Sequence, residues 1–97
     1  MNLKPNSLNK VIHEPARLSI MMHLFVVSDA DFVYLKRATE MTAGNLSAHL
    51  TKLEDAGFVK ITKSFEGKKP KTTCKLTVKG RKDFQDYREN ILKVLGE

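Results

Sequence analysis

The sequence predicts an α+β domain, mainly helical, in which a cluster of helices is followed by a two-stranded hairpin and one last helix. Apolar residues recur at helical spacing through most of the first half of the chain. They alternate with polar residues from Val59 to Leu76, and they return to helical spacing after Thr77. A chain of 97 residues is long enough for one such domain with a modest core.

The first segment is expected to be a short helix. Leu8, Val11 and Ile12 fall at i, i+3 and i+4, and the polar pair at 6–7 supplies a helix cap. We therefore treat residues 1–13 as an N-terminal arm or short helix that precedes the main domain.

A strongly apolar helix is expected from Ala16 to about Ser28, with Pro15 in its first turn, where proline is tolerated. Its apolar residues cover nearly the whole circumference: Leu18, Ile20, Met21, Met22, Leu24, Phe25, Val26 and Val27. A helix of this kind is covered on more than one side. The core of a small domain covers one side, which leaves the other for a second subunit.

A short strand at Phe32 and Val33 is expected next, and then a helix over Tyr34–Thr39 with Leu35 and Ala38 directed inward. This helix is the first of a closely spaced pair, since the next helix signal follows within a few residues.

The second helix of the pair has clear start and stop signals. Thr42 is a good N-cap, and Met41 and Leu46 are spaced for a hydrophobic staple. The helix runs to about Ala56, and Gly57 follows where a left-handed residue is favoured. One stripe of the helix is leucine: Leu46, Leu50 and Leu53.

Two strands and a last helix complete the pattern. Residues 59–65 alternate between apolar and polar, residues 66–70 form the turn, and residues 72–76 alternate again. Thr77 caps a helix over Val78–Leu95. Its apolar side is a narrow seam of Phe84, Tyr87, Ile91, Val94 and Leu95.

This order of elements is that of a winged helix-turn-helix domain, in which the hairpin is the wing. We assign residues 14–77 to this domain and residues 78–97 to a C-terminal helix.

The charge is concentrated in one part of the chain. The net charge is +6, but residues 1–57 carry equal numbers of basic and acidic residues. Residues 58–82 carry nine basic residues and one acidic residue, a net charge of +8, and residues 83–97 have a net charge of −2. Such a compact positive segment suits a polyanion, although a solvated Lys-rich surface would give the same composition.

A helix that reads DNA needs an apolar stripe on one face and small or polar residues near its N-terminus on the other. The second helix of the pair has both, and its candidate contact residues are Thr42, Ala43, Gly44, Asn45, Ser47, Ala48, His49 and Lys52. Asn45 suits an adenine edge and Ala48 a thymine methyl group. In the alternative interpretation, Thr42 and Asn45 only cap the helix. His49 is expected to reach a phosphate or to pack against the wing.

The wing carries the second set of candidates, Lys63, Lys68, Lys69 and Lys71. The last three crowd a tight turn around Pro70, so that their mutual repulsion would be relieved by phosphate groups.

Three segments resemble a known family: Pro15-Ala-Arg-Leu-Ser-Ile-Met, Gly44-Asn-Leu-Ser-Ala-His-Leu and Lys69-Pro-Lys-Thr-Thr-Cys-Lys-Leu-Thr-Val-Lys-Gly-Arg. Together they resemble the short winged-helix transcriptional regulators of the MarR and ArsR groups, over about residues 14–88. The resemblance implies a homodimer that binds a palindromic operator in double-stranded DNA as a repressor. The implied dimer residues are Leu8, Val11, Ile12, Phe84, Tyr87, Ile91 and Leu95. Unlike ArsR-type metal sensors, this chain has no cluster of Cys and His residues.

Other functions find little support. The single cysteine, Cys74, excludes an internal disulfide and a Cys-based zinc site, and the spacing of the three histidines matches no common zinc motif. We therefore expect no metal, no cofactor and no catalysis. No apolar run approaches the roughly 20 residues that span a bilayer, so a cytoplasmic, nucleoid-associated protein is expected. A non-specific architectural DNA-binding protein and a protein-interaction module remain as alternatives, and the sequence identifies no effector.

Overall fold

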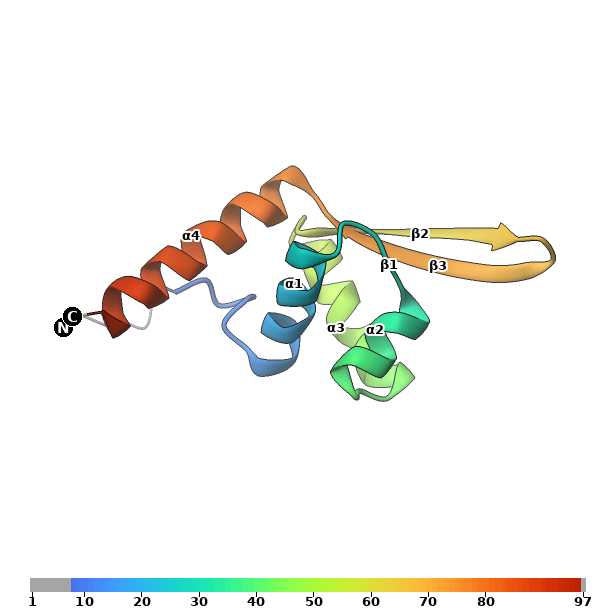
Figure 1. Ribbon diagram of the computed structural model, residues 1–97, viewed down its shortest axis with the longest axis horizontal. Helices are drawn as coiled ribbons and strands as arrows, with labels where there is room; N and C mark the ends of the chain where they lie inside the picture. Colours follow the sequence, from blue (N-terminus) through green and yellow to red (C-terminus); the bar gives the residue numbers. More distant parts are fainter. Residues whose placement is uncertain (1–7, 97) are drawn as a thin grey trace.

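The computed structural model describes residues 8–96, and its helices and strands follow the predicted order from residue 15 onward (Figure 1). In order they are α1 (Pro15–Val26), β1 (Ala30–Asp31), α2 (Phe32–Thr39), α3 (Ala43–Asp55), β2 (Val59–Glu66), β3 (Lys69–Leu76) and α4 (Val78–Leu95). Helices α1, α2 and α3 cluster in the middle, the wing (β2 and β3) projects to one side, and α4 extends to the other. The predicted winged, mainly helical α+β fold is thereby confirmed.

The three strands form one antiparallel sheet in the order β1-β3-β2. In the wing, Val59 pairs with Leu76 and Glu66 with Lys69, so that only Gly67 and Lys68 make the turn. This turn is shorter than the sequence indicates. Gly67 has a φ of +65°, and a glycine at the first central position is what a two-residue type II′ turn requires.

The core lies where the three-helix cluster meets the root of the wing. Its fully buried side chains come from the segment before α1, from the three helices of the cluster and from β3: Ile12, Ile20, Met21, Leu24, Leu35, Leu46, Leu50, Leu53 and Cys74. The predicted leucine stripe of α3 is therefore confirmed as the buried face of that helix. No polar or charged side chain of residues 8–96 is buried, which is the usual outcome for a small core that cannot offset the desolvation of charges.

The expected N-terminal helix is not found in the described part of the chain, where residues 8–14 form turns. The Oδ1 atom of Asn9 accepts hydrogen bonds from the N–H groups of Val11 (3.0 Å) and Ile12 (3.1 Å). This Asn-based turn competes with helix formation. The segment turns back on the domain, and Leu8 and Ile12 become part of the core. The caps expected at 6–7 lie outside the described residues.

Both β1 and α2 begin earlier in the chain than predicted. The short strand is Ala30–Asp31, two residues earlier than expected, because Ala30 pairs with Cys74 of β3. Asp31 then caps α2, accepting a hydrogen bond from the N–H of Tyr34 (2.6 Å). Leu35 is buried as predicted, but Ala38 is exposed, because the last turn of α2 extends past the core into solvent.

Four residues join α3, the wing and α4 at one point, which we call the junction: Gly57, Phe58, Thr77 and Gly80. The N–H of Thr77 donates to the carbonyl of Phe58 (3.0 Å), and its hydroxyl donates to the carbonyl of Gly57 (2.6 Å). The same hydroxyl accepts from the N–H of Gly80 (2.9 Å), which confirms Thr77 as the cap of α4. Gly80 packs directly on the backbone of Phe58, where a Cβ atom would overlap the carbonyl oxygen.

Replacing Gly80 with alanine should therefore destabilise the protein, because rigid backbone cannot make room for the methyl group. We expect the free energy of unfolding to fall by about 1–3 kcal/mol, measured by urea denaturation. Gly44→Ala is the matched control, since Gly44 also lies in a helix but has no atom within 4 Å of the added Cβ. That change should raise stability by roughly 0.5–1 kcal/mol. A Gly80→Ala protein as stable as the wild type would show that the junction is not tight.

Cys74 is predicted to be unreactive in the folded protein. It is 1% exposed, and burial, helped by the charge of Glu54, raises the pKa of its thiol to about 11. Iodoacetamide should therefore label Cys74 slowly in buffer and rapidly in urea. Because the pKa is higher in the folded state, the stability due to the neutral thiol is present below the ordinary pKa of 9.0 and lost as the pH rises toward 11. Equal labelling rates in buffer and urea would contradict this assignment.

Candidate nucleic-acid interface

The exposed face of α3 carries six of the predicted contact residues: Thr42, Ala43, Gly44, Asn45, Ser47 and Ala48. The leucine stripe lies on the opposite face, so that small and polar side chains alone meet solvent at the start of the helix. Thr42 is the N-cap, and its Oγ1 atom accepts a hydrogen bond from the backbone N–H of Asn45 (3.1 Å). Since this bond uses only the backbone of Asn45, the side-chain amide remains available for contacts outside the protein.

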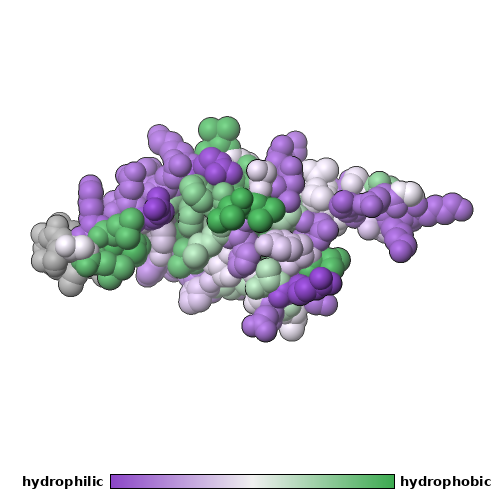
Figure 2. Space-filling view, in the orientation of Figure 1, coloured by the Kyte–Doolittle hydropathy of each residue, from purple (hydrophilic) through white to green (hydrophobic). Residues whose placement is uncertain are grey.

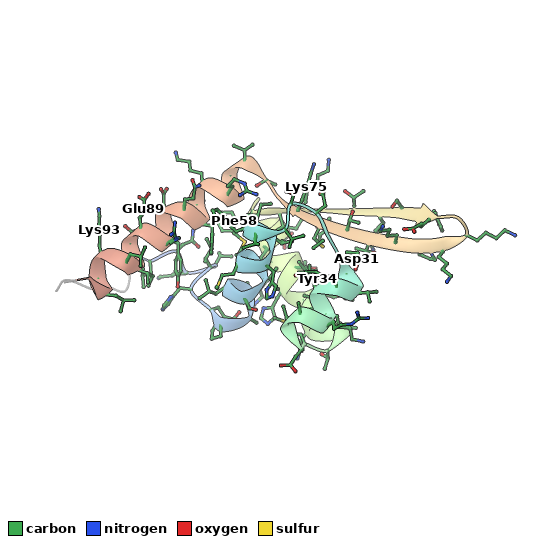
Figure 3. All side chains as sticks on the ribbon, in the orientation of Figure 1. Asp31, Tyr34, Phe58, Lys75, Glu89 and Lys93 are labelled. Atoms are coloured by element: carbon green, nitrogen blue, oxygen red, sulfur yellow. The ribbon has the colours of Figure 1, made fainter. Side chains whose placement is uncertain are left out.

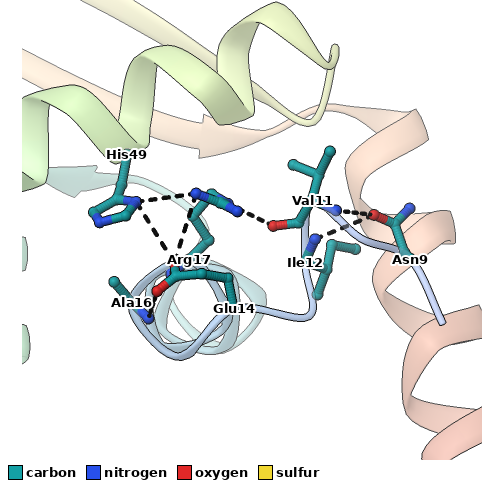
Figure 4. A network of polar contacts seen from close by, with 7 residues as sticks. All are labelled: Asn9, Val11, Ile12, Glu14, Ala16, Arg17 and His49. Carbon is teal, nitrogen blue, oxygen red and sulfur yellow. Dashed lines mark hydrogen bonds and ion pairs between the residues drawn. The ribbon is translucent and has the colours of Figure 1, made fainter. Parts of the chain in front are cut away.

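His49 lies elsewhere than expected, on the side of α3 that faces α1 (Figure 4). Its Nδ1 atom is 3.3 Å from Nη1 of Arg17 and 3.5 Å from Oε2 of Glu14. Arg17 also donates to the carbonyl of Val11 (2.6 Å). His49 thus ties α3 to the beginning of α1, and it contacts neither the wing nor the exposed face of α3. The sequence holds no signal for this pairing, because the two helices are far apart along the chain.

Glu14 is the anionic centre of this network. Burial tends to raise the pKa of its carboxyl group, but hydrogen bonds from the backbone of Arg17 and Ala16 and the nearby charges of His49 and Arg17 outweigh it. The pKa of Glu14 is therefore lowered, and the carboxylate keeps its charge at neutral pH. Glu14 is also the N-cap of α1, so that one carboxylate fixes both the start of α1 and the side chain of His49.

Three cations flank the exposed face of α3. Lys52 is exposed near the end of α3, as the sequence predicts. Lys36 and Arg37 are exposed in the last turn of α2, and the sequence analysis did not consider them. The first helix of a helix-turn-helix pair crosses the DNA backbone, so adjacent basic residues at its end were the signal that would have identified them.

The wing presents its lysines to solvent, and Figure 2 shows it as predominantly hydrophilic. Lys63, Lys68 and Lys69 are exposed. Lys71 is half-buried, and its Nζ atom is 2.9 Å from Oε2 of Glu66, an ion pair that raises the pKa of Lys71. The only acidic residue of the wing is therefore neutralised within the wing itself.

A groove of about 590 Å³ separates the exposed side of α3 from the wing. Ser47, Thr51 and Glu54 line it from α3, and residues of both wing strands line it from the other side: Ile61, Lys63 and Thr72. In Figure 3, Tyr34 lies with the helices on one side of the wing. Lys75 lies on the opposite side, at the root of the wing. Oε2 of Glu54 accepts from the N–H of Ile61 (3.3 Å) and so links the end of α3 to β2. The groove therefore brings one predicted contact residue of α3, Ser47, opposite one predicted contact residue of the wing, Lys63.

Two cations of the positive segment have structural partners. Nζ of Lys79 lies 5.2 Å from the centre of the Phe58 ring and donates to the carbonyl of Ala56 (3.2 Å). The guanidinium of Arg81 lies 5.0 Å from the centre of the Phe25 ring. Both side chains hold the first turns of α4 against the core by cation–π contact.

Four of the seven residues expected in a dimer interface are buried within the chain: Leu8, Ile12, Phe84 and Tyr87. This corrects the expectation for these four, because side chains covered by their own core leave little surface for a second subunit. Ile91 and Val11 are half-buried and Leu95 is 75% exposed. Leu92, which the sequence analysis did not single out, is 53% exposed on the same part of α4, and Figure 2 shows apolar surface at that end of the molecule.

The histidines outside α3 also have local partners. Nδ1 of His13 lies 2.7 Å from the hydroxyl of Tyr87, and Nδ1 of His23 lies 2.7 Å from the carbonyl of Ser19. Within residues 8–96 no three His, Cys, Asp or Glu side chains come together as a metal site would require. Nor does any helix of this range combine the length and apolar character needed to cross a membrane.

A family model described as a winged helix DNA-binding domain matches residues 16–95. An uncharacterized protein of Methanocaldococcus jannaschii is 39% identical over 85 residues, which cover 88% of this chain and 92% of that protein.

Solved structures show the same similarity. The transcriptional regulator homologue protein from Pyrococcus horikoshii OT3 has a TM-score of 0.84 and 28% identity over 89% of this chain and 85% of that chain. An ArsR family transcriptional regulator has a TM-score of 0.59 and 19% identity over 100% of this chain and 98% of that chain, which shows a common fold. The winged-helix part of the resemblance is confirmed by the family match, and the ArsR family structure shares the fold. The chain belongs to the winged helix DNA-binding domain family, whose members are transcriptional regulators without enzymatic activity.

Proposed function

We propose that this chain is a sequence-specific regulator that binds a palindromic operator in double-stranded DNA as a homodimer and acts as a repressor. One observation carries the proposal: the groove between α3 and the wing is lined by Ser47 and Thr51 of α3 on one side and by Lys63 of the wing on the other. A surface that combines base-reading side chains and phosphate-binding cations on adjacent elements suits duplex DNA. A repressor would act simply by occupying its operator.

In this proposal α3 lies in the major groove. Its first two turns carry the exposed side chains of Asn45, Ser47 and Ala48. Asn45 would hold an adenine edge, Ser47 would bond to a base, and Ala48 would meet a thymine methyl group. Gly44 has open space around it, so the backbone there can approach a phosphate closely.

The wing supplies affinity and register. Lys63, Lys68 and Lys69 are exposed cations, which would contact phosphates and release counterions. Lys36 and Arg37 of α2 would bind the backbone on the other side of α3. Contacts of this kind carry no base information, so the choice of sequence rests on α3.

The dimer would form through the exposed end of α4. Leu92 and Leu95 are exposed there, and Ile91 lies half-buried beside them. Exposed apolar side chains clustered on one element suit burial against a second copy. With residues 78–97 as the dimerisation element, each protomer would present one α3 helix and one wing, and a two-fold axis would give a palindromic operator.

The contributions of the wing and α3 can be separated by substitution. Lys69→Ala should weaken binding to operator and random duplex about equally and reduce the log–log salt slope by roughly one, because one phosphate contact is lost. Asn45→Ala should weaken operator binding by about 1–3 kcal/mol and leave random duplex unaffected. Fluorescence anisotropy across a salt series measures both. Lys82→Ala is the matched control, since Lys82 is an exposed lysine on α4 that lies outside both the wing and the exposed end of α4.

Selection of bound duplexes from a random pool provides the operator for this experiment. A homodimer predicts symmetric half-sites about ten base pairs apart, or a multiple of that spacing. Wild-type binding that is weak and insensitive to salt would contradict DNA binding altogether and favour a protein-interaction module. Equal affinity for selected and random duplex would instead indicate an architectural protein.

The dimer contact has its own test. Replacing Leu92 and Leu95 together with glutamate should shift the protein from dimer to monomer in sedimentation velocity, because two charges cannot be buried in an apolar contact. Affinity for the selected palindrome should fall by tenfold or more, as the second half-site is lost. Val78→Glu is the control, because Val78 is 90% exposed at the opposite end of α4. A double variant that remains dimeric would exclude this surface as the interface.

A further inference from the structure

One aromatic side chain near the tip of the wing is largely exposed to solvent. Phe65 is 73% exposed, whereas the other four phenylalanines, all within the described residues, are buried or half-buried. Its cross-strand partner is Pro70, which is also exposed. Neither residue contributes to the core.

The pair lies on the side of the wing that faces α3. Side chains alternate along a strand, so Phe65 shares a face with Lys63 and Ile61. Both of these residues line the groove opposite Ser47 and Thr51 of α3. A duplex held in that groove would therefore meet the side of the wing on which Phe65 lies.

The surroundings of the ring favour a nucleic acid over a protein. Lys63 lies on the same face as the ring and Lys68 lies in the adjacent turn, and both are exposed. Glu66 and Lys69 pair across the strands on the other face, and the carboxylate of Glu66 is already paired with Lys71. One ring and one proline are far smaller than the apolar patches of a few hundred Å² that mark protein docking sites. A small apolar group framed by cations is instead how minor-groove wedges are built.

The reach of the wing fits the same partner. β2 runs for 8 residues, from Val59 to Glu66, and at about 3.3 Å per residue it spans roughly 26 Å. When α3 occupies the major groove, the adjacent minor groove lies about half a helical turn away, roughly 17 Å along the DNA axis. The tip therefore extends far enough to meet that groove.

We propose that Phe65, supported by Pro70, is a wedge that enters the minor groove beside the segment contacted by α3 and partly unstacks one base step in each half-site. Flexible pyrimidine–purine steps cost least to unstack, so the wedge adds a preference for such a step at the outer positions of the operator. This inference rests on the proposed DNA-binding function and adds a sequence preference that no base-edge contact supplies.

Phe65→Ala and Phe65→Leu test the wedge on the selected operator, with 2-aminopurine placed at successive positions outside the segment contacted by α3. Wild-type protein should raise the probe fluorescence at one step per half-site, because unstacking relieves quenching. Phe65→Ala should abolish the rise and weaken binding by roughly tenfold without changing the salt slope, since no phosphate contact is lost. Phe65→Leu should keep most of both effects. Lys69→Ala is the comparison, because it should lower the salt slope and preserve the fluorescence rise.

Thermal unfolding followed by circular dichroism should show unchanged melting temperatures for both variants, because the ring is exposed. If Phe65→Ala binds with wild-type affinity and gives the same fluorescence pattern, the wedge is excluded while DNA binding stands. A wild-type complex without any fluorescence rise also excludes it. Failure of the wild-type protein to bind duplex at all would overturn the proposed function as well, so the two failures are distinct.

Discussion

The contact between Gly80 and the backbone of Phe58 determines the arrangement of the other elements. At this point α3 has ended, β2 begins, β3 has returned and α4 starts, and Thr77 bonds to the carbonyls of both Gly57 and Phe58. A larger residue than glycine in α4 would push the helix away from the strand. Because the contact is made through backbone atoms, it fixes the directions of three elements at once and leaves little freedom of adjustment.

The orientation of the wing depends on how its root is held, because the rest of the wing makes few contacts with the domain. Beyond Ile61, β2 is exposed along its whole length, so only the root of the wing can set the angle between the wing and α3. At the root, that angle is set by the junction, by the bond from Ile61 to Glu54, by the pairing of β3 with β1 and by the buried side chains of Val59 and Cys74. The distance between a base-reading helix and a phosphate-binding hairpin must match the groove spacing of DNA. The residues that determine this match are therefore buried and far from the DNA itself.

Local signals allowed most of the fold to be predicted from the sequence. The caps Thr42 and Thr77, the positive φ of Gly57 and the alternation of the wing depend only on neighbouring residues. The predictions that were wrong concern segments whose structure depends on tertiary contacts. The segment before α1 folds back as turns because Leu8 and Ile12 find a place in the core, and β1 is defined by its pairing with β3. The spacing of apolar residues in the sequence cannot reveal either of these contacts.

The same distinction applies to the candidate site, because a charge count does not say what each charge contacts. The positive segment carries nine cations, but Lys79 and Arg81 pack on aromatic rings and Lys71 is paired with Glu66. His49, which lies on α3, belongs to a network with Glu14. Five lysines of the wing are exposed, Lys60, Lys63, Lys68, Lys69 and Lys75, so its electrostatic contribution per protomer is smaller than the net charge of the segment suggests. A second protomer, or contacts that are not electrostatic, would add to the affinity that these lysines give. The exposed end of α4 and the apolar tip of the wing are the surfaces that can supply them.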